Sequence, residues 1–157
     1  MEYFLLEVHE AFTPPSLKGW FEKLDANGLK TYSRHEMFFV SDIPQMVYTD
    51  IMLHPCFMVS QEAKRVIELY EPHMRFQRII LYNQEKKKSK AYHIPVLKPN
   101  PPLGNENQQA LVKLMLNNEV YILIRLDLAE SLLRRDAIGI GLQEIRWASP
   151  EENQDEQ

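Results

Sequence analysis

The stretch "ILIRLDLAESLLRRDAIGIGLQEI", Ile122–Ile145, spells a strand, a short helix and a second strand, and it decides the fold. The continuous apolar run at residues 120–126 predicts a buried strand. The segment "LAESLLRR" at residues 128–135 has the polar and apolar spacing of an amphipathic helix. The segment at residues 137–147 predicts the closing strand. A helix of this length must pack on a sheet, so the stretch predicts a layered domain.

Local signals support these boundaries. Asp127 and Glu130 have the spacing of a capping box, with Asp in place of the usual Ser or Thr, and predict the helix start. Gly139 and Gly141 alternate with apolar residues and leave one face of the closing strand bare for close packing. The opposite face is expected to carry Ile138, Ile140 and Leu142.

A similar pattern occurs earlier in the chain, at Cys56–Ile80, "CFMVSQEAKRVIELYEPHMRFQRII". Its apolar start predicts a strand, Ser60 is expected to cap a helix over residues 61–71, and Pro72 ends that helix. Residues at i, i+3, i+4 and i+7 form one apolar stripe that should face the core. These residues are Ala63, Val66, Ile67 and Tyr70.

The two stretches align without a gap at an offset of 66 residues. The alignment sets Val66 and Ile67 against Leu132 and Leu133, and all four side chains are expected in the core. Any two strand-helix-strand units align by hydrophobic class, so a duplication and a chance similarity both remain open. Both alternatives predict the same architecture.

Other segments complete the prediction. Proline donates no hydrogen bond to a ladder, so Pro95 predicts that its strand lies at a sheet edge. A short helix is expected over residues 108–117. Further strands are expected at Tyr3–Val8, 36–40 and 46–53, with a hairpin of strands at 74–82 and 90–97. The prediction is a single α+β domain over residues 1–150, with a mixed, mostly antiparallel sheet and short helices packed on it, followed by a disordered acidic tail at residues 151–157.

The charges divide unevenly along the chain. The net charge is −4, yet the tail alone holds four of the 22 acidic residues, and the remaining 18 balance the 18 Lys and Arg. A neutral body does not suggest a nucleic-acid binder, which needs clustered basic side chains. Within the body the first fifty residues are acidic, with eight acids and four bases, whereas residues 51–100 are basic.

Cys56 is the single cysteine, so the chain forms no internal disulfide. The opening "MEYFLLEVHEAF" has acids where a signal peptide needs basic residues, and no segment approaches the length of a membrane span. These features predict a soluble, cytoplasmic protein that does not enter a membrane.

The sequence predicts no catalytic residue, no metal ligand set and no cofactor. Cys56 with His54 forms the best nucleophile-like cluster, but Cys56 opens an apolar run and is expected to be a buried, inert thiol. The five histidines lack metal-ligand spacing. The lysine run at residues 85–90 is expected to be a solvated turn.

Two segments resemble a family of bacterial immunity proteins that accompany secreted polymorphic toxins. The phrase "FMVSQEAKRVIE" is similar to the family's strand, Val-Ser and acidic helix, and "IRLDLAESLLRRDAIGIGLQEI" to its closing motif. The resemblance runs from about Cys56 to Trp147 and implies a small cytoplasmic α+β protein without catalytic residues. It implies a function as well, which is to bind a cognate toxin domain and neutralise it.

The contact face of such a binder is expected in the least regular and most acidic quarter of the chain. Interfaces favour aromatic anchors surrounded by polar residues, and this quarter supplies both. The predicted contact residues are Trp20, Glu22, Asp25, Glu36, Asp42 and Asp50.

Two alternatives remain open. The chain could be a small ligand-binding or assembly module that docks a strand at the sheet edge near Pro95. It could also be an enzyme in which Cys56 acts with His54 or His35, and a pocket that joins these residues would favour that alternative.

Overall fold

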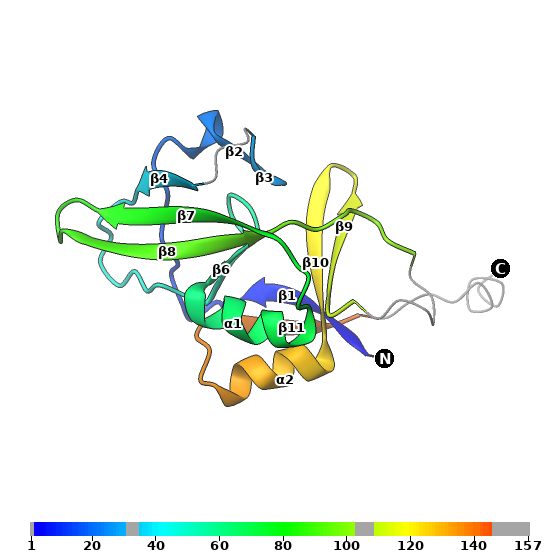
Figure 1. The fold of residues 1–157 in the computed structure, drawn as a ribbon. Coiled ribbons are helices and arrows are strands. Elements are labelled where there is room, and N and C mark those ends of the chain that lie inside the picture. Colours follow the sequence, from blue (N-terminus) through cyan, green and yellow to red (C-terminus); the bar gives the residue numbers. More distant parts are fainter. Residues whose placement is uncertain (1, 31–34, 103–108, 146–157) are drawn as a thin grey trace, which may run out of the picture.

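The computed structural model describes residues 2–30, 35–102 and 109–145, so the predicted disordered tail lies outside the described residues (Figure 1). The elements in chain order are β1 (Tyr3–Val8), the 3-10 turn η1 (Trp20–Glu22), β2 (Leu24–Asp25), β3 (Gly28–Leu29), β4 (His35–Phe39), β5 (Ile51–Met52), β6 (Met58–Ser60), α1 (Gln61–Tyr70), β7 (Phe76–Asn83), β8 (Lys88–Pro95), β9 (Leu111–Leu116), β10 (Glu119–Arg125), α2 (Leu126–Arg134) and β11 (Ile140–Glu144).

Two sheets carry the fold. The first has four strands in the order β11-β1-β10-β9, and the second has five in the order β4-β7-β8-β6-β5. Only β4 and β7 pair in parallel within these sheets, and the other neighbours are antiparallel. The two helices pack against each other, and in Figure 1 α1 lies in front of β1 and β11, with α2 below it. This arrangement confirms the α+β prediction with mostly antiparallel strands.

Each strand-helix-strand stretch forms the same topological unit. In the first unit, β6 and β7 flank β8, which is antiparallel to both. In the second unit, β10 and β11 flank β1, again antiparallel to both. Each helix therefore connects two parallel strands that leave a gap of one strand between them. The chain fills the first gap by a hairpin and the second with its N-terminal strand.

Helix α1 begins and ends where its sequence predicts. The Ser60 hydroxyl accepts a hydrogen bond from the Ala63 backbone N–H at 3.1 Å, which satisfies one of the free donors of the first turn. The helix ends at Tyr70, two residues before Pro72. Ala63, Val66 and Ile67 are buried and confirm the predicted stripe.

Helix α2 departs from the prediction at both its cap and its buried face. It begins at Leu126, and no side chain caps it. Asp127 lies in the first turn, where its carboxylate accepts hydrogen bonds from the Arg125 side chain at 2.6 and 3.0 Å, so the predicted capping box is wrong. The helix buries Leu128, Ala129 and Leu132. Its buried face is therefore rotated relative to the predicted one and leaves Leu133 47% exposed, so the prediction of a core position for Leu133 is wrong as well.

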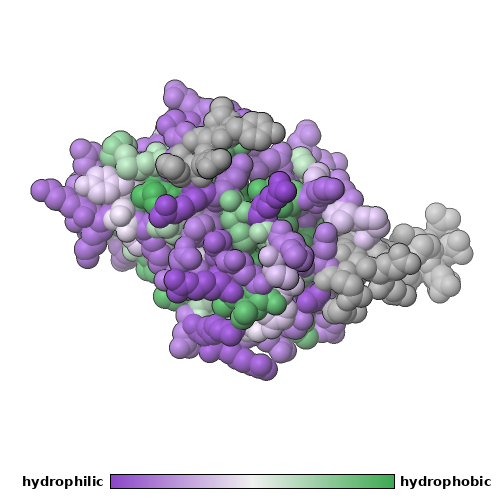
Figure 2. All heavy atoms as spheres, in the orientation of Figure 1, coloured by the Kyte–Doolittle hydropathy of each residue, from purple (hydrophilic) through white to green (hydrophobic). Residues whose placement is uncertain are grey.

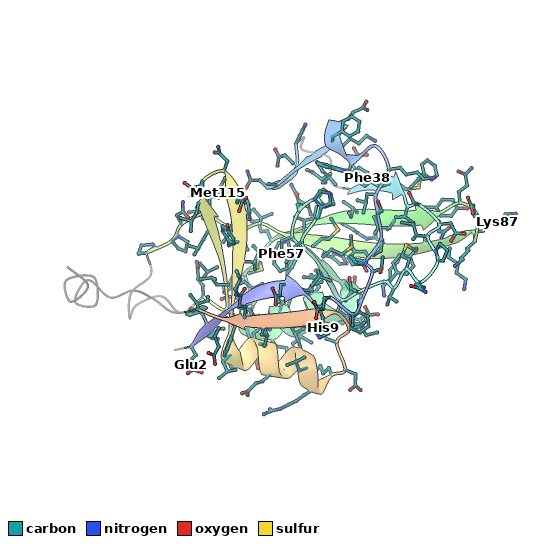
Figure 3. The ribbon with its side chains drawn as sticks, turned by 180° about the vertical axis from the view of Figure 1, so that it is seen from behind. Glu2, His9, Phe38, Phe57, Lys87 and Met115 are labelled. Carbon is teal, nitrogen blue, oxygen red and sulfur yellow. The ribbon has the colours of Figure 1, made fainter. Side chains whose placement is uncertain are left out.

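Two hydrophobic cores result. The helix core lies between the helices and both sheets and includes Phe57, which lies between the two sheets in Figure 3. The lead-in core lies on the opposite face of the five-stranded sheet, where residues 17–24 cover it. The lead-in core consists of Leu17, Leu24, Phe38, Val40, Met52, Cys56, Met58, Ile79, Leu81, Tyr92 and Ile94.

The predicted helix at residues 108–117 is wrong, because Leu111–Leu116 form strand β9. Leu111, Leu114 and Met115 have the spacing of an amphipathic helix, which caused the wrong prediction. Asn117 and Asn118, with φ of 52° and 63°, form the two-residue turn of a tight hairpin between β9 and β10. Asparagine tolerates this left-handed conformation better than most residues. The Asn-Asn pair is thus the signal that identifies the hairpin.

Three strand predictions need smaller corrections. Strand β8 lies inside its sheet, between β7 and β6, and not at the edge. The sheet accommodates Pro95 because this residue lies at the end of β8, beyond the residues that pair with the short strand β6. The strand predicted at residues 46–53 shrinks to Ile51–Met52. The closing strand begins only at Ile140, so Ile138 lies before it and is 41% exposed.

The predicted close packing at the two glycines of this segment is confirmed. A Cβ atom at Gly139 would lie 2.6 Å from a methyl carbon of Thr49, and the φ of Gly139 is +88°. At Gly141 it would lie 2.9 Å from a side-chain carbon of Glu7. Both positions therefore require glycine for the approach of neighbouring chain segments.

Candidate functional site

The structure distributes the six predicted contact residues over three places. Trp20, Glu22 and Asp25 lie together in η1 and β2, above the five-stranded sheet in Figure 1. Glu36 lies on the edge strand β4. The two remaining acids, Asp42 and Asp50, lie in the connection between β4 and β5, and each has a separate environment.

Asp50 joins the two units of the fold. One carboxylate oxygen accepts a hydrogen bond from the Ser60 hydroxyl at 2.5 Å, and the other accepts one from the Ile138 backbone N–H at 2.6 Å. The backbone N–H of Asp50 also donates to the Ile138 carbonyl at 2.8 Å. Asp50 thus connects the start of α1 to the segment before β11, and its carboxylate serves the fold.

Asp42 and Glu36 are paired with basic side chains. Asp42 lies 3.5 Å from the Lys86 ammonium and accepts a hydrogen bond from the Asn83 amide at 3.2 Å. The Asn83 bond lowers the pKa of Asp42. Glu36 lies 2.9 Å from the Lys23 ammonium. Both carboxylates therefore carry less uncompensated charge than the sequence indicates.

The half-buried Trp20 and the exposed residues Phe21, Glu22 and Asp25 form a compact turn, which we call the acidic turn. The Lys30 ammonium donates to the Phe21 carbonyl at 2.7 Å, and the Trp20 ring packs edge-on against His54 at 5.3 Å. Leu24, 1% exposed, anchors the turn in the lead-in core. The turn is thus held in place by its own contacts.

Phe21 is the residue of this turn that sequence reasoning missed. Its side chain is 62% exposed, although it lies between Trp20 and the acidic Glu22. The apolar pattern of the segment suggests burial of both Trp20 and Phe21. Only the packing of Trp20 against its neighbours in the fold shows that Phe21 is the ring exposed to solvent.

Cys56 is buried, as predicted, at 2% exposure. Burial raises the pKa of its thiol to about 12, so a thiolate is a minor species at neutral pH. His54, the nearest partner in sequence, packs against Trp20, and the side chain of His35 lies outside the described residues. The described part of the chain brings no three His, Cys, Asp or Glu side chains together in a metal-binding group.

Two surface cavities lie apart from Cys56. The first, which we call the helix-end cavity, has a volume of about 280 Å³ and lies between the start of α1 and the end of α2. Tyr48 lines it, and the hydroxyl of Tyr48 is buried without a hydrogen-bond partner among the described residues. The second, which we call the junction groove, has a volume of about 410 Å³ and lies between the segment before β7, the segment after β8 and the start of β9.

The rest of the described surface offers only scattered apolar side chains. Figure 2 shows the hydrophobic atoms of one face in small patches separated by polar side chains. Met37 and Phe39, on β4, are 50% and 42% exposed. The sheet edge near Pro95, one of the alternatives for strand docking, is not available because Pro95 is buried and β8 is internal.

Comparison with known proteins adds no relative: no protein-family model matches the chain, and no curated protein matches it. Among the described residues, neither helix has the length and apolarity to cross a membrane.

Proposed function

We propose that the chain is a non-catalytic bacterial immunity protein that binds a cognate toxin in the cytoplasm and neutralises it through the acidic turn. The single observation that carries this proposal is Phe21, a large aromatic side chain 62% exposed on an anchored turn that also carries Glu22 and Asp25. The sequence resemblance to immunity proteins supplies the biological context.

An aromatic ring exposed to water is less stable than one buried in an apolar pocket, so burial of the ring in a partner protein favours binding. Burial of apolar surface contributes roughly 25 cal/mol per Å², and aromatic anchors are among the residues that dominate binding energies. Glu22 and Asp25 place two carboxylates on the same turn as this anchor, whose backbone carbonyl binds the Lys30 ammonium. The complementary partner surface therefore has an apolar pocket flanked by basic side chains.

The pre-formed turn favours tight association. Leu24 is fixed in the lead-in core and Lys30 holds the turn backbone, so little conformational entropy remains to be lost on binding. A disordered segment would lose more. The turn therefore acts as a rigid anchor.

One alternative function has an observation in its favour. The helix-end cavity and the junction groove suit a small ligand-binding module, and the groove volume of about 410 Å³ falls within the usual range for ligand sites. An enzyme based on Cys56 is less favoured, because burial raises the thiol pKa to about 12.

The test uses the product of the gene next to this one, in a bacterial host. Co-expression should protect the host from that product, and the two proteins should co-purify. Phe21→Ala should weaken both effects without lowering the melting temperature, because the ring is exposed. Leu69→Ala is the matched control, since Leu69 is 68% exposed on α1, at the opposite end of the molecule from η1 in Figure 1. Full protection by the Phe21 variant would show that the acidic turn is not the binding surface.

A further inference from the structure

The junction groove is built from three segments that the fold brings together at the meeting point of the two units. Residues after α1 form one wall, residues after β8 form the second, and the start of β9 closes the base. Beyond the groove the chain crosses toward β9, where the Asn100 N–H donates to the Lys113 carbonyl at 2.8 Å (Figure 1). The groove is therefore a consequence of how the two sheets are connected.

The lower part of the groove is apolar. Leu111 is 1% exposed and belongs to the helix core, and Met74 and Leu97 pack against that core. Val96 remains 55% exposed at the side of the groove. These four side chains offer a ligand an apolar surface that is already in place.

The rim of the groove is cationic. Arg75 and Lys98 line it from opposite walls, and neither forms an ion pair with a described residue. The one acidic lining residue, Glu71, accepts a hydrogen bond from the Ala110 N–H at 2.6 Å, and Arg125 interacts with it electrostatically. The negative charge of Glu71 is thus partly compensated, whereas neither cation is ion-paired with any residue that the structure describes.

Two walls of the groove are fixed to one another. The Val96 N–H donates to the Arg75 carbonyl at 2.9 Å, which continues the pairing of β7 and β8 by one more bond. The backbone of Arg75 thus lies opposite Val96, and Lys98 follows two residues later, so both cations line the same groove.

We propose that the junction groove binds a small organic anion, with its carboxylate or phosphate between Arg75 and Lys98 and its apolar body over Met74, Leu97 and Leu111. The inference is independent of the toxin-binding proposal, because the acidic turn and the junction groove share no residue. A cavity of this size suits a small molecule, and the paired cations select its charge.

The test measures binding of four probes that share an eight-carbon chain: octanoate, octyl phosphate, octanol and octylammonium. The protein carries ¹³C-methyl methionine, so the Met74 methyl resonance reports the groove directly. Met52 and Met58, both 0% exposed in the lead-in core, serve as internal references. Octanoate or octyl phosphate should shift the Met74 resonance saturably and leave the two reference resonances unchanged. Tighter binding of either anion supports the proposal and identifies the preferred headgroup.

Substitutions then test the cations. Arg75→Gln with Lys98→Gln should weaken binding of the anions by about tenfold or more, because each removes a charge-assisted contact. The matched control is Arg65→Gln with Lys87→Gln, which removes the same charge elsewhere; Figure 3 shows Lys87 at the tip of the β7-β8 hairpin. The proposal is overturned if octanol binds as tightly as octanoate, if both double variants bind alike, or if the Met74 resonance does not move.

Discussion

The two strand-helix-strand units share a topology but complete it in different ways. The first unit takes its middle strand from the next segment of the chain, through the β7-β8 hairpin, whereas the second takes β1 from the far end of the sequence. Their helices are also seated differently: α1 buries Ile67, and α2 turns the equivalent Leu133 toward solvent and buries Leu128 instead. The comparison teaches that a repeated sequence pattern predicts the path of the chain but not the face that a helix presents.

The largest expected effect tests the seating of the helices. Ile67→Ala should lower the free energy of unfolding by about 2–5 kcal/mol, because Ile67 is 1% exposed in the helix core. Leu133→Ala should cost less than about 1 kcal/mol, since nearly half of its surface is exposed to water already. Chemical denaturation of both variants measures the difference. Leu132→Ala is the control within α2 and should cost as much as Ile67→Ala. Equal losses at Ile67 and Leu133 would show that the two helices are seated alike.

A smaller effect tests the connection between the units. Asp50→Ala should destabilise the protein by about 1–3 kcal/mol, because it removes the acceptor of the Ser60 hydroxyl and the Ile138 N–H. Glu130→Ala is the matched control, since its pairing with Arg134 is an exposed interaction on α2, and it should cost less. Thermal melts of the two variants provide the comparison. If Asp50→Ala proves neutral, the two units do not depend on this carboxylate for their connection.

A third effect concerns pH and is confined to the first unit. His93 is 4% exposed and its Nε2 lies 2.6 Å from the Gln61 side-chain oxygen. Burial first, and then Lys64 and Arg78, lower the pKa of His93 from 6.5 to about 4, with Glu68 opposing them. Between about pH 4 and pH 6.5, His93 therefore binds a proton in the unfolded chain but not in the folded protein.

The stability that neutral His93 contributes is complete above pH 6.5 and is lost as the pH falls from about 6.5 to about 4. The loss should be on the order of 1 kcal/mol once solvent screening is considered. Denaturation at a series of pH values in this window measures it, and His93→Gln should flatten the profile. An identical slope in the variant would assign the pH dependence to other groups.

Local signals predict much of this fold. Ser60, the stripe on α1 and the hairpin of β7 and β8 are all visible in the sequence, because capping, periodicity and turn residues act over a few positions. The α+β class follows from them. The predictions for Pro95 and for the segment of β9 are wrong, because their structure depends on the strands that pair with them. Strand β6 ends before it reaches Pro95, and pairing with β10 makes a segment with helix-like spacing a strand.

The candidate site is less predictable for a related reason. Sequence composition identifies the acidic quarter, yet it cannot show that Asp50 binds Ser60 and Ile138 or that Asp42 faces Lys86. These partners lie up to 88 positions away along the chain. The exposure of Phe21 has the same origin, because it depends on which neighbouring ring the fold covers.

The smallest expected effect on stability, and the largest on function, belongs to the acidic turn. The decisive measurement is a calorimetric titration of the Glu22→Lys and Asp25→Lys double variant with the product of the neighbouring gene, next to a thermal melt. The control is Glu130→Lys with Asp136→Lys, which changes the net charge equally on and just after α2. We expect the melting temperature of the turn variant to stay within about 2 °C of the parent and its affinity to fall by about tenfold or more, with the control unaffected. Unchanged affinity of the turn variant for a partner that the parent protein binds would contradict the proposal that the acidic turn is the contact surface.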